Sequence, residues 1–510
     1  MLCAVMCASR YNPSVRMQSI SPNSEATASQ GHALVRGIGL PQAVALNLLE
    51  MIGVGPFITL PLVVAAMGGP QAMLGWLLGA LLAVCDGLVW AELGAAMPRA
   101  GGSYVFLREI YGEVFGEPVG RGVSFLYVWQ LALSAPLSIA SGCIGLTQYA
   151  AYLWPALHRP LFAARFAARF LPAWLPLQVD RAALLAIAAC WLAVILLHRS
   201  IRGAGRISLF LWFGVLATLG WILFAGATHF HPALAFSFPS GAFHLSRKFF
   251  LGLGAATLLA TYDYWGYYNA CFLGGEVRHP QRNIPRAVLL SIGCVAVLYL
   301  AMNLSVLGVL PWQEILNGRN TNLATSVIAV FIARIYGSTA ARWMAVLILW
   351  TAFASIFSLL LGYSRVFYAA AVDGNFFSRF ARLHPRYRIP HVALIWLGVI
   401  ASLACFFRLI DVIAALVVLR LLLQFLLQQF GLLLLRRRRP EMFASFRMKL
   451  YPLPAWIAIA GSLFMLVARH GSGRQLLLAT VIALAGMGIY GVRWARGTNT
   501  VAASDGTKQL

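Results

Sequence analysis

The sequence predicts an all-α polytopic membrane protein with about twelve transmembrane helices. Of its 510 residues, 60% are hydrophobic and 11% are charged, and the mean hydropathy is +0.78. This charged fraction is about half that of an ordinary soluble protein. So few charged residues cannot provide the polar surface that a soluble protein with so apolar a core needs in water. The composition therefore excludes a disordered chain, a disulfide scaffold and a soluble enzyme.

Apolar runs of about 20 residues, the length that crosses a bilayer as a helix, recur along the chain. The segment 323–336 is shorter, and we expect an external interfacial or re-entrant helix there. The full-length runs lie near 38–66, 71–97, 121–153, 182–198, 207–229, 248–274, 286–310, 340–371, 391–407, 410–435, 452–469 and 475–495.

The distribution of Lys and Arg predicts the orientation. If the N-terminus is cytoplasmic, the cytoplasmic segments hold 26 Lys and Arg residues and the external segments 12. This bias predicts that both termini are cytoplasmic, although the external loop 154–181 carries four Arg residues. We expect an integral, multi-pass protein of the plasma (inner) membrane. The formal net charge of +24 then reflects topology, so we expect membrane lipid and no nucleic acid as a partner.

The first apolar run contains a helix breaker at mid-membrane depth. Two Gly residues and a Pro follow one another within four residues, 53–56. Backbone groups freed there must face a cavity, an ion or a substrate. Pro56 suits the first turn of a restarted half-helix, whose N–H groups at Val54, Gly55 and Phe57 would face an anionic group. The alternative is a Pro kink within a packed helix.

The sixth run carries a second interruption, rich in aromatic residues around Asp263 and Gly266. Interruptions at corresponding positions of two five-span halves point to the binding site of a transporter. The aromatic rings at the breaks could close over a substrate or bind its cation. The predicted substrate-binding residues are Ile52, Gly53, Val54, Gly55, Phe57, Tyr262, Asp263, Tyr264, Trp265 and Gly266.

Four carboxylates lie within predicted spans: Glu50, Asp86, Glu92 and Asp263. An intramembrane carboxylate is a functional candidate by default. Asp263 could bind a substrate ammonium or a coupled proton, and its alternative role is to cap the half-helix. Arg365 and Arg420 are expected toward span ends, so the partner of Asp263 is predicted to be mobile. Glu50, one turn before the first break, serves either coupling or packing.

Thr351 and Ser355 are candidates for ion coupling because residues at i and i+4 share one helix face. Their hydroxyl groups could bind a sodium ion, or could bond to their own backbone. The carboxylates Glu50 and Asp263 favour a proton over sodium as the coupled ion. The eight Cys residues show no metal-ligand spacing, and no metal or other cofactor is expected.

Four motifs resemble the amino acid–polyamine–organocation superfamily. Residues 52–57 are similar to its G-x-G-I-F break, and residues 92–104 to E-L-x(4)-P-x-x-G-G-x-Y. Residues 275–287 resemble E-V-x-x-P-x-R-x-I-P-R-A, and residues 364–375 resemble S-R-x-x-Y-A-x-A-x-D-G. The gate or loop residues of these signatures are Glu92, Gly101, Gly102, Tyr104, Glu276, Arg282 and Arg286.

The resemblance implies a LeuT-type fold with two inverted five-span repeats. The repeats would occupy 38–229 and 248–435, followed by two extra helices in 452–495. Tails at 1–37, expected to be disordered, and 496–510 flank them, and Met17 is an alternative start to Met1. Pro56 departs from the family break. The fifth span is a second departure, because many members carry a Lys there, whereas residues 207–226 hold no Lys or Arg and Val215 stands near that position.

The resemblance also implies secondary active transport of amino acids or polyamines by alternating access. Substrate would bind between spans one and six, with spans three and eight completing the pocket. An exchanger and a non-transporting nutrient sensor with the same fold remain as alternatives. We expect no enzyme, because the chain has no His-Glu-x-x-His, no nucleophile elbow and no phosphate-binding loop.

Overall fold

The computed structural model describes residues 36–159, 180–199, 201–317, 325–407, 420–467, 477 and 479–492. Helices dominate this part of the chain. The β-type contacts within it are two isolated bridges, which join Ile38 to Val277 and Ala100 to Leu273. The prediction of an all-helical protein is confirmed to this extent.

Five described helices are long and apolar enough to cross a membrane. They are α4 (Met73–Ala96), α6 (Glu117–Leu153), α9 (Ile201–Thr228), α13 (Pro280–Leu307) and α16 (Val327–Val372). Shorter apolar helices are α8 (Arg181–Leu197), α17 (His391–Ala404), α20 (Leu453–Val467) and Ala479–Val492. Twelve spans remain a prediction, because residues 410–419 of the tenth predicted span lie outside the described residues.

Helix α16 is bent at Gly337, whose φ of 84° is not helical. The bend separates residues 327–336 from the long remainder of the helix. These residues belong to the segment for which the sequence predicts a short interfacial or re-entrant helix. The remainder matches the predicted eighth span.

The first span is broken where the sequence predicts it. Helix α2 (Leu40–Met51) and helix α3 (Gly55–Met67) are bent by 43° relative to each other across residues 52–54. Pro56 lies in the first turn of α3, where its missing N–H removes no helical hydrogen bond. Helix α2 packs mainly against α13, α9 and α16, whereas α3 packs mainly against α11 and makes a smaller contact with α16, so the main neighbours of the two halves differ.

The sixth span is broken as well. Helix α11 (Arg247–Tyr264) ends before Trp265, and α12 (Asn269–Phe272) follows as a single turn. Gly266 has a φ of 124°, a value that favours glycine. A Cβ atom on Gly266 would lie 2.7 Å from the backbone nitrogen of Met51, so the two breaks are in contact.

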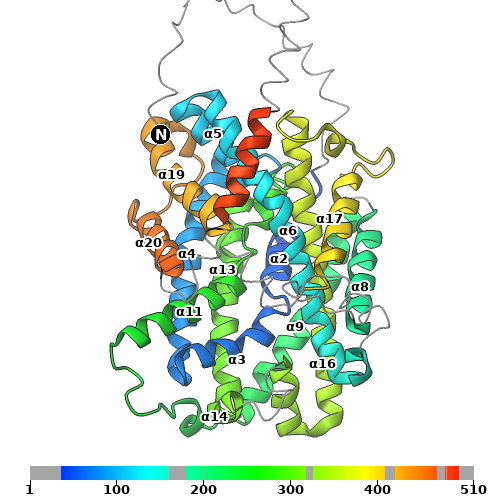
Figure 1. Ribbon diagram of the computed structural model, residues 1–510, viewed down its shortest axis with the longest axis vertical. Coiled ribbons are helices and arrows are strands. Elements are labelled where there is room, and N and C mark those ends of the chain that lie inside the picture. Colours follow the sequence, from blue (N-terminus) through cyan, green and yellow to red (C-terminus); the bar gives the residue numbers. More distant parts are fainter. Residues whose placement is uncertain are drawn as a thin grey trace, which may run out of the picture.

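The helices form one elongated bundle with distinct ends (Figure 1). Helix α5 (Ser103–Phe115) and the start of the described chain lie at one end, which we call the N-terminal end, and α3 and α14 (Trp312–Leu316) lie at the other. Between the ends, α4 packs against α13, α11 and α20, while α16 packs against α6 and α9. Helix α2, the first half of the broken first span, contacts both groups, through α13 on one side and through α16 and α9 on the other.

Buried hydrogen bonds join α2 and α12 to α16. These bonds lie between the two breaks and the N-terminal end of the bundle. The Asn47 side chain accepts a bond from the backbone N–H of Ala270 at 2.9 Å. The Asn269 amide donates to the Ser358 hydroxyl at 2.8 Å, and Ser358 donates to the Leu46 carbonyl at 2.8 Å. Three helices that are distant in sequence are thereby held together, and we call these bonds the asparagine clamp.

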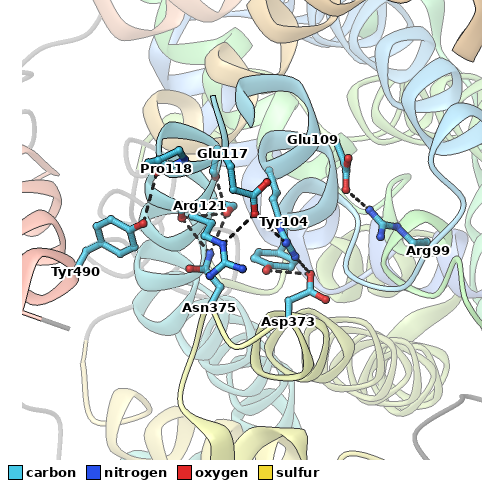
Figure 2. Close-up of polar contacts among 12 residues, drawn as sticks. Arg99, Tyr104, Glu109, Glu117, Pro118, Arg121, Asp373, Asn375 and Tyr490 are labelled. Atoms are coloured by element: carbon cyan, nitrogen blue, oxygen red, sulfur yellow. Dashed lines mark hydrogen bonds and ion pairs between the residues drawn. The ribbon is translucent and has the colours of Figure 1, made fainter. Parts of the chain in front are cut away.

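A polar cluster joins α5 and α6 to the end of α16 (Figure 2). The Asp373 carboxylate accepts hydrogen bonds from the Tyr104 hydroxyl at 3.1 Å and from Arg108 at 2.5 Å. The Asn375 amide donates to the Ser124 hydroxyl at 3.0 Å. Two of the four family-like motifs, those containing Tyr104 and Asp373, therefore meet in space.

Candidate functional site

A cavity of about 60 Å³ lies where the two breaks meet. Its walls come from α2 and the first break, α6, α11 and the second break, α16, and the start of η4 (Leu421–Leu426). The lining residues are Glu50, Met51, Gly53, Val54, Gly55, Ser138, Ser141, Gly142, Tyr262, Asp263, Trp265, Tyr268, Ser355, Leu359, Tyr363 and Arg420.

The first break leaves backbone donors at the cavity wall. Within the described part of the chain, the N–H groups of Gly53, Val54 and Gly55 donate to no protein acceptor. The N–H of Phe57, expected to face an anion, instead donates to the Val54 carbonyl at 3.1 Å. Because α3 begins at Gly55, its positive dipole end adds to the attraction of these donors for negative charge.

Asp263 lies in the last turn of α11, directly before the second break, and is 3% exposed. Its Oδ2 atom accepts a hydrogen bond from the Thr59 hydroxyl on α3. Its Oδ1 atom has no hydrogen-bond partner among the described residues. Neither oxygen accepts a backbone N–H, so the capping bonds of the alternative role are not present in this structure. The carboxylate therefore presents an open acceptor to the cavity.

Glu50 and Arg420 line the same cavity and are 7% and 3% exposed. The Arg420 guanidinium donates to the hydroxyls of Tyr363 at 2.6 Å, Ser138 at 2.8 Å and Tyr268 at 3.0 Å. The Tyr363 hydroxyl also lies 3.5 Å from Oε1 of Glu50. The expectation that Arg420 lies toward a span end, away from the site, is therefore wrong.

Tyrosine and serine hydroxyls supply the remaining polar lining. The hydroxyls of Tyr262 and Ser141 are 2.9 Å apart and join α11 to α6. Trp265 stacks on Phe425 of η4, with ring centroids 4.9 Å apart. The cavity is thus polar at the breaks and along α6, and aromatic toward η4.

Seven of the ten predicted substrate-binding residues line the cavity or shape it. Two of the predicted ion-coupling residues, Glu50 and Ser355, line it as well. Gly53, Val54, Gly55, Tyr262, Asp263 and Trp265 line the cavity, and Gly266 fixes the contact between the breaks. Ile52, Phe57 and Tyr264 are buried but do not line it.

Thr351 does not line the cavity either. Its hydroxyl donates to the Leu347 carbonyl at 3.0 Å and contacts Thr218 of α9 at 3.2 Å. Thr351 and Ser355 therefore do not present their hydroxyls to the cavity as a pair. Among the described residues, no group of three or more His, Cys, Asp or Glu side chains is arranged to hold a metal ion.

Sequence reasoning missed the contributions of individual residues on α6, α16 and the tenth span. Ser138, Ser141 and Tyr363 come from the two spans expected to complete the pocket, but were not singled out. Arg420 carried a signal, since an arginine within an apolar run is costly and usually functional. The tenth span as a whole was not expected at the site.

Asp86 is a second buried carboxylate, and it lies outside this cavity. It accepts hydrogen bonds from the Tyr267 hydroxyl and the Gln429 amide, each at 2.6 Å. These bonds join α4 to the second break and to α19 (Leu427–Arg438). Both carboxylate oxygens are satisfied by protein donors, in contrast to those of Asp263.

The signature residues lie at the N-terminal end of the bundle. Glu92 is fully buried, pairs with Arg436 at 2.9 Å and accepts the backbone N–H of Met448 at 3.1 Å. Glu276 forms a two-bond ion pair with Arg365 of α16, at 3.0 and 3.2 Å. We call it the Glu276–Arg365 pair, and both side chains are fully buried.

Other signature residues surround these pairs. The N–H of Gly101 donates to the Phe272 carbonyl at 3.0 Å, and Gly102 packs directly on the Phe272 ring. Burial and the nearby Asp373 carboxylate raise the pKa of Tyr104, which remains a neutral donor. Arg282 and Arg286 lie in the first turns of α13 and are exposed.

Comparison with known proteins agrees with this architecture. The profile of the amino acid permease family matches residues 38–492. The chain is 26% identical to the serine/threonine exchanger SteT of Bacillus subtilis, over 91% of this chain and 98% of that protein. It is 28% identical to the human Asc-type amino acid transporter 1, over 92% of this chain and 84% of that protein.

A vacuolar cationic amino acid transporter of Arabidopsis thaliana is 24% identical over 80% of this chain, which spans 65% of that protein's length. All of these relatives are transporters or exchangers of amino acids, and none is an enzyme. The match to the family profile extends from the first broken helix through the last described one. The chain is an integral, multi-pass membrane protein that belongs to the amino acid permease family of the amino acid–polyamine–organocation superfamily.

Proposed function

We propose that this chain is a secondary active transporter that binds an α-amino acid in the cavity between its two broken helices. The single observation that carries the proposal is the juxtaposition of open N–H donors at residues 53–55 with the open carboxylate oxygen of Asp263. An α-amino acid carries a carboxylate and an ammonium on one carbon. It therefore matches a donor group and an acceptor that face the same small space.

In this proposal, the N–H groups of Gly53, Val54 and Gly55 receive the α-carboxylate at the start of α3. Pro56 supplies no donor, but the three preceding residues do. Asp263 receives the α-ammonium, which compensates a carboxylate that is otherwise costly at this depth. A polyamine lacks the carboxylate and would leave the backbone donors unused, so we favour amino acids over polyamines.

Alternating access would follow from movement of the broken helices against their neighbours. The main partners of the half-helices α2 and α3 differ, so the cavity can open toward one end while the other end stays closed. Asp263 and Glu50 are the candidate proton carriers, because each has a carboxylate oxygen without a hydrogen-bond partner among the described residues. We therefore propose proton coupling in preference to sodium.

Uptake by purified protein in proteoliposomes tests the function. Radiolabelled L-serine, L-alanine and spermidine are offered under a proton gradient, a sodium gradient, or amino acid loaded inside the vesicles. We expect amino acid uptake that a protonophore abolishes, and no spermidine uptake. Uptake that requires sodium and resists the protonophore would refute proton coupling.

Two alternatives give different results in the same assay. An exchanger takes up label only when the vesicles contain amino acid, and its uptake is indifferent to the protonophore. The relative SteT is named as an exchanger, which makes this the stronger alternative. A sensor shows no uptake in any condition, although amino acids raise its melting temperature by mass action.

A further inference from the structure

Arg420 is a buried cation that lines the cavity. It has no role in the proposed binding of the head group, by which we mean the α-carboxylate and α-ammonium of the substrate. It directly precedes η4, a π-helical turn within the tenth span. Such turns occur often at functional sites. The same turn carries Phe425, which stacks on Trp265, and the Arg420 guanidinium lies 5.8 Å from the Trp265 ring. Arg420 is therefore held at the aromatic wall of the cavity.

The protein partners of Arg420 are neutral. Its guanidinium donates to three hydroxyls, and its Nε atom has no acceptor among the described residues. None of the ion pairs in the described part of the chain includes Arg420. Glu50 is reached only across the hydroxyl of Tyr363. A guanidinium is always charged and carries five donors, so a buried donor without an acceptor is costly.

We propose that Arg420 determines specificity by binding an oxygen atom of the substrate side chain and repelling side chains that carry a positive charge. The inference rests on the proposed function, in which the head group occupies the breaks. The side chain then extends along the cavity toward Arg420. A carboxylate, a hydroxyl or an amide oxygen satisfies the open guanidinium donor, whereas an ammonium cannot.

The magnitude of this discrimination follows from electrostatics. A like charge about 6 Å from the guanidinium, at an effective dielectric constant of about 20, weakens binding on the order of 100-fold. Glu50 offsets part of this repulsion, so we expect at least about 10-fold discrimination. Replacing a side-chain hydroxyl by a methyl group leaves the donor unsatisfied and costs about 10-fold or more.

Pairs of matched substrates test the proposal on the wild-type protein. L-Serine and L-2-aminobutyrate differ only in a hydroxyl and a methyl group, and L-lysine and L-norleucine differ mainly in the terminal charge. The assay is competition against radiolabelled L-serine in proteoliposomes, together with the ligand-induced rise in melting temperature in detergent. We expect L-serine to exceed L-2-aminobutyrate, and L-norleucine to exceed L-lysine, by about 10-fold or more in apparent affinity.

L-Glutamate distinguishes the two sources of the side-chain oxygen. If L-glutamate binds more tightly than L-serine, Arg420 binds a side-chain carboxylate of the substrate. If L-serine binds more tightly, Arg420 binds a side-chain hydroxyl. Either order supports the proposal. Equal binding of L-serine and L-2-aminobutyrate, or binding of L-lysine as tight as that of L-norleucine, overturns it. This substrate panel decides the matter even if no variant folds.

Variants add a second line of evidence. Arg420→Gln removes the charge, and the double variant Arg420→Gln with Glu50→Gln also restores the charge balance. We expect the affinity for L-lysine relative to L-norleucine to rise at least about 10-fold in either variant. Arg334→Gln removes an arginine that is paired with Glu314 at the surface, and it should leave both ratios unchanged.

The failures of the two proposals are distinguishable. A wild-type protein that neither takes up nor is stabilised by any amino acid refutes the proposed function. A wild-type protein that transports L-serine and L-lysine equally well keeps the function but removes the role of Arg420. A folded Arg420→Gln variant that keeps the wild-type ratios of affinity for the matched substrates also removes the role of Arg420 and keeps the function.

Discussion

Gly55 is the position at which a single methyl group should disable the site. A Cβ atom there would overlap Oδ1 of Asp263 and lie 3.3 Å from its carboxyl carbon. Carbon atoms in favourable contact are about 3.5–4.0 Å apart, so the carboxylate must move on the order of 1 Å. That movement pulls Asp263 away from Thr59 and from the ammonium position proposed for the substrate.

The size of the effect follows from this displacement. A misplacement of about 1 Å in a positioned group can lower kcat/KM by on the order of 100-fold. Overpacking of a buried site lowers the free energy of unfolding by about 1–3 kcal/mol, which a protein of this size should tolerate. We therefore expect Gly55→Ala to fold and to lose most uptake, and the bulkier Gly55→Leu to abolish it.

Initial rates of uptake in proteoliposomes, normalised to folded protein, measure this loss. Gly53→Ala is the matched comparison, because its Cβ would meet the Ser355 hydroxyl at 2.8 Å and the Ser355 Cβ at 3.1 Å, so it crowds a serine on α16 and leaves the Asp263 carboxylate in place. Gly293→Ala is the control, since its Cβ would meet no atom within 4 Å. Uptake by Gly55→Ala that equals uptake by Gly293→Ala would refute the placement of the substrate at the first break.

Three further predictions concern buried charges. Asp263→Asn should lose most uptake or change its pH dependence while the melting temperature stays near that of the wild type; wild-type kinetics across a pH series would reduce Asp263 to a structural role. Glu276→Gln or Arg365→Gln alone should lower the free energy of unfolding by about 3–5 kcal/mol, because each strands a buried charge. Denaturation of the double variant should show a loss smaller than the sum of the two. Asp86→Asn should cost about 1–3 kcal/mol, because an amide can accept from only one of the two facing donors; a melting temperature unchanged from the wild type would contradict this.

The sequence predicted the parts of the fold that depend on backbone chemistry. Gly53, Gly55 and Pro56 together disfavour an uninterrupted helix, and the structure breaks the helix at residues 52–54. The second interruption was expected around Asp263 and Gly266; the helix continues through Asp263 to Tyr264 and breaks at Trp265 and Gly266. The aromatic residues before the break are compatible with helix, so only the glycine marks its position.

The parts that depend on the rotation of each helix were not predictable. Tyr262 and Tyr264 are two residues apart on α11, so they point in different directions, and only Tyr262 reaches the cavity. Thr351 and Ser355 share a face by spacing, but spacing does not say which neighbour that face meets. Arg420 was misjudged for a similar reason: a position in an apolar run gives neither its depth nor the direction of its side chain.

The asparagine clamp makes one backbone amide a reporter of opening at the N-terminal end. The N–H of Ala270 donates to the Asn47 side chain and not to its own helix, and Ala270 is fully buried. This amide can exchange its hydrogen with solvent only when α12 separates from α2 and water enters between them. The exchange rate of this amide therefore reports how often α12 separates from α2, and measuring it needs no label or ligand. An amino acid that closes the N-terminal end should slow this exchange, and one that opens it should accelerate it.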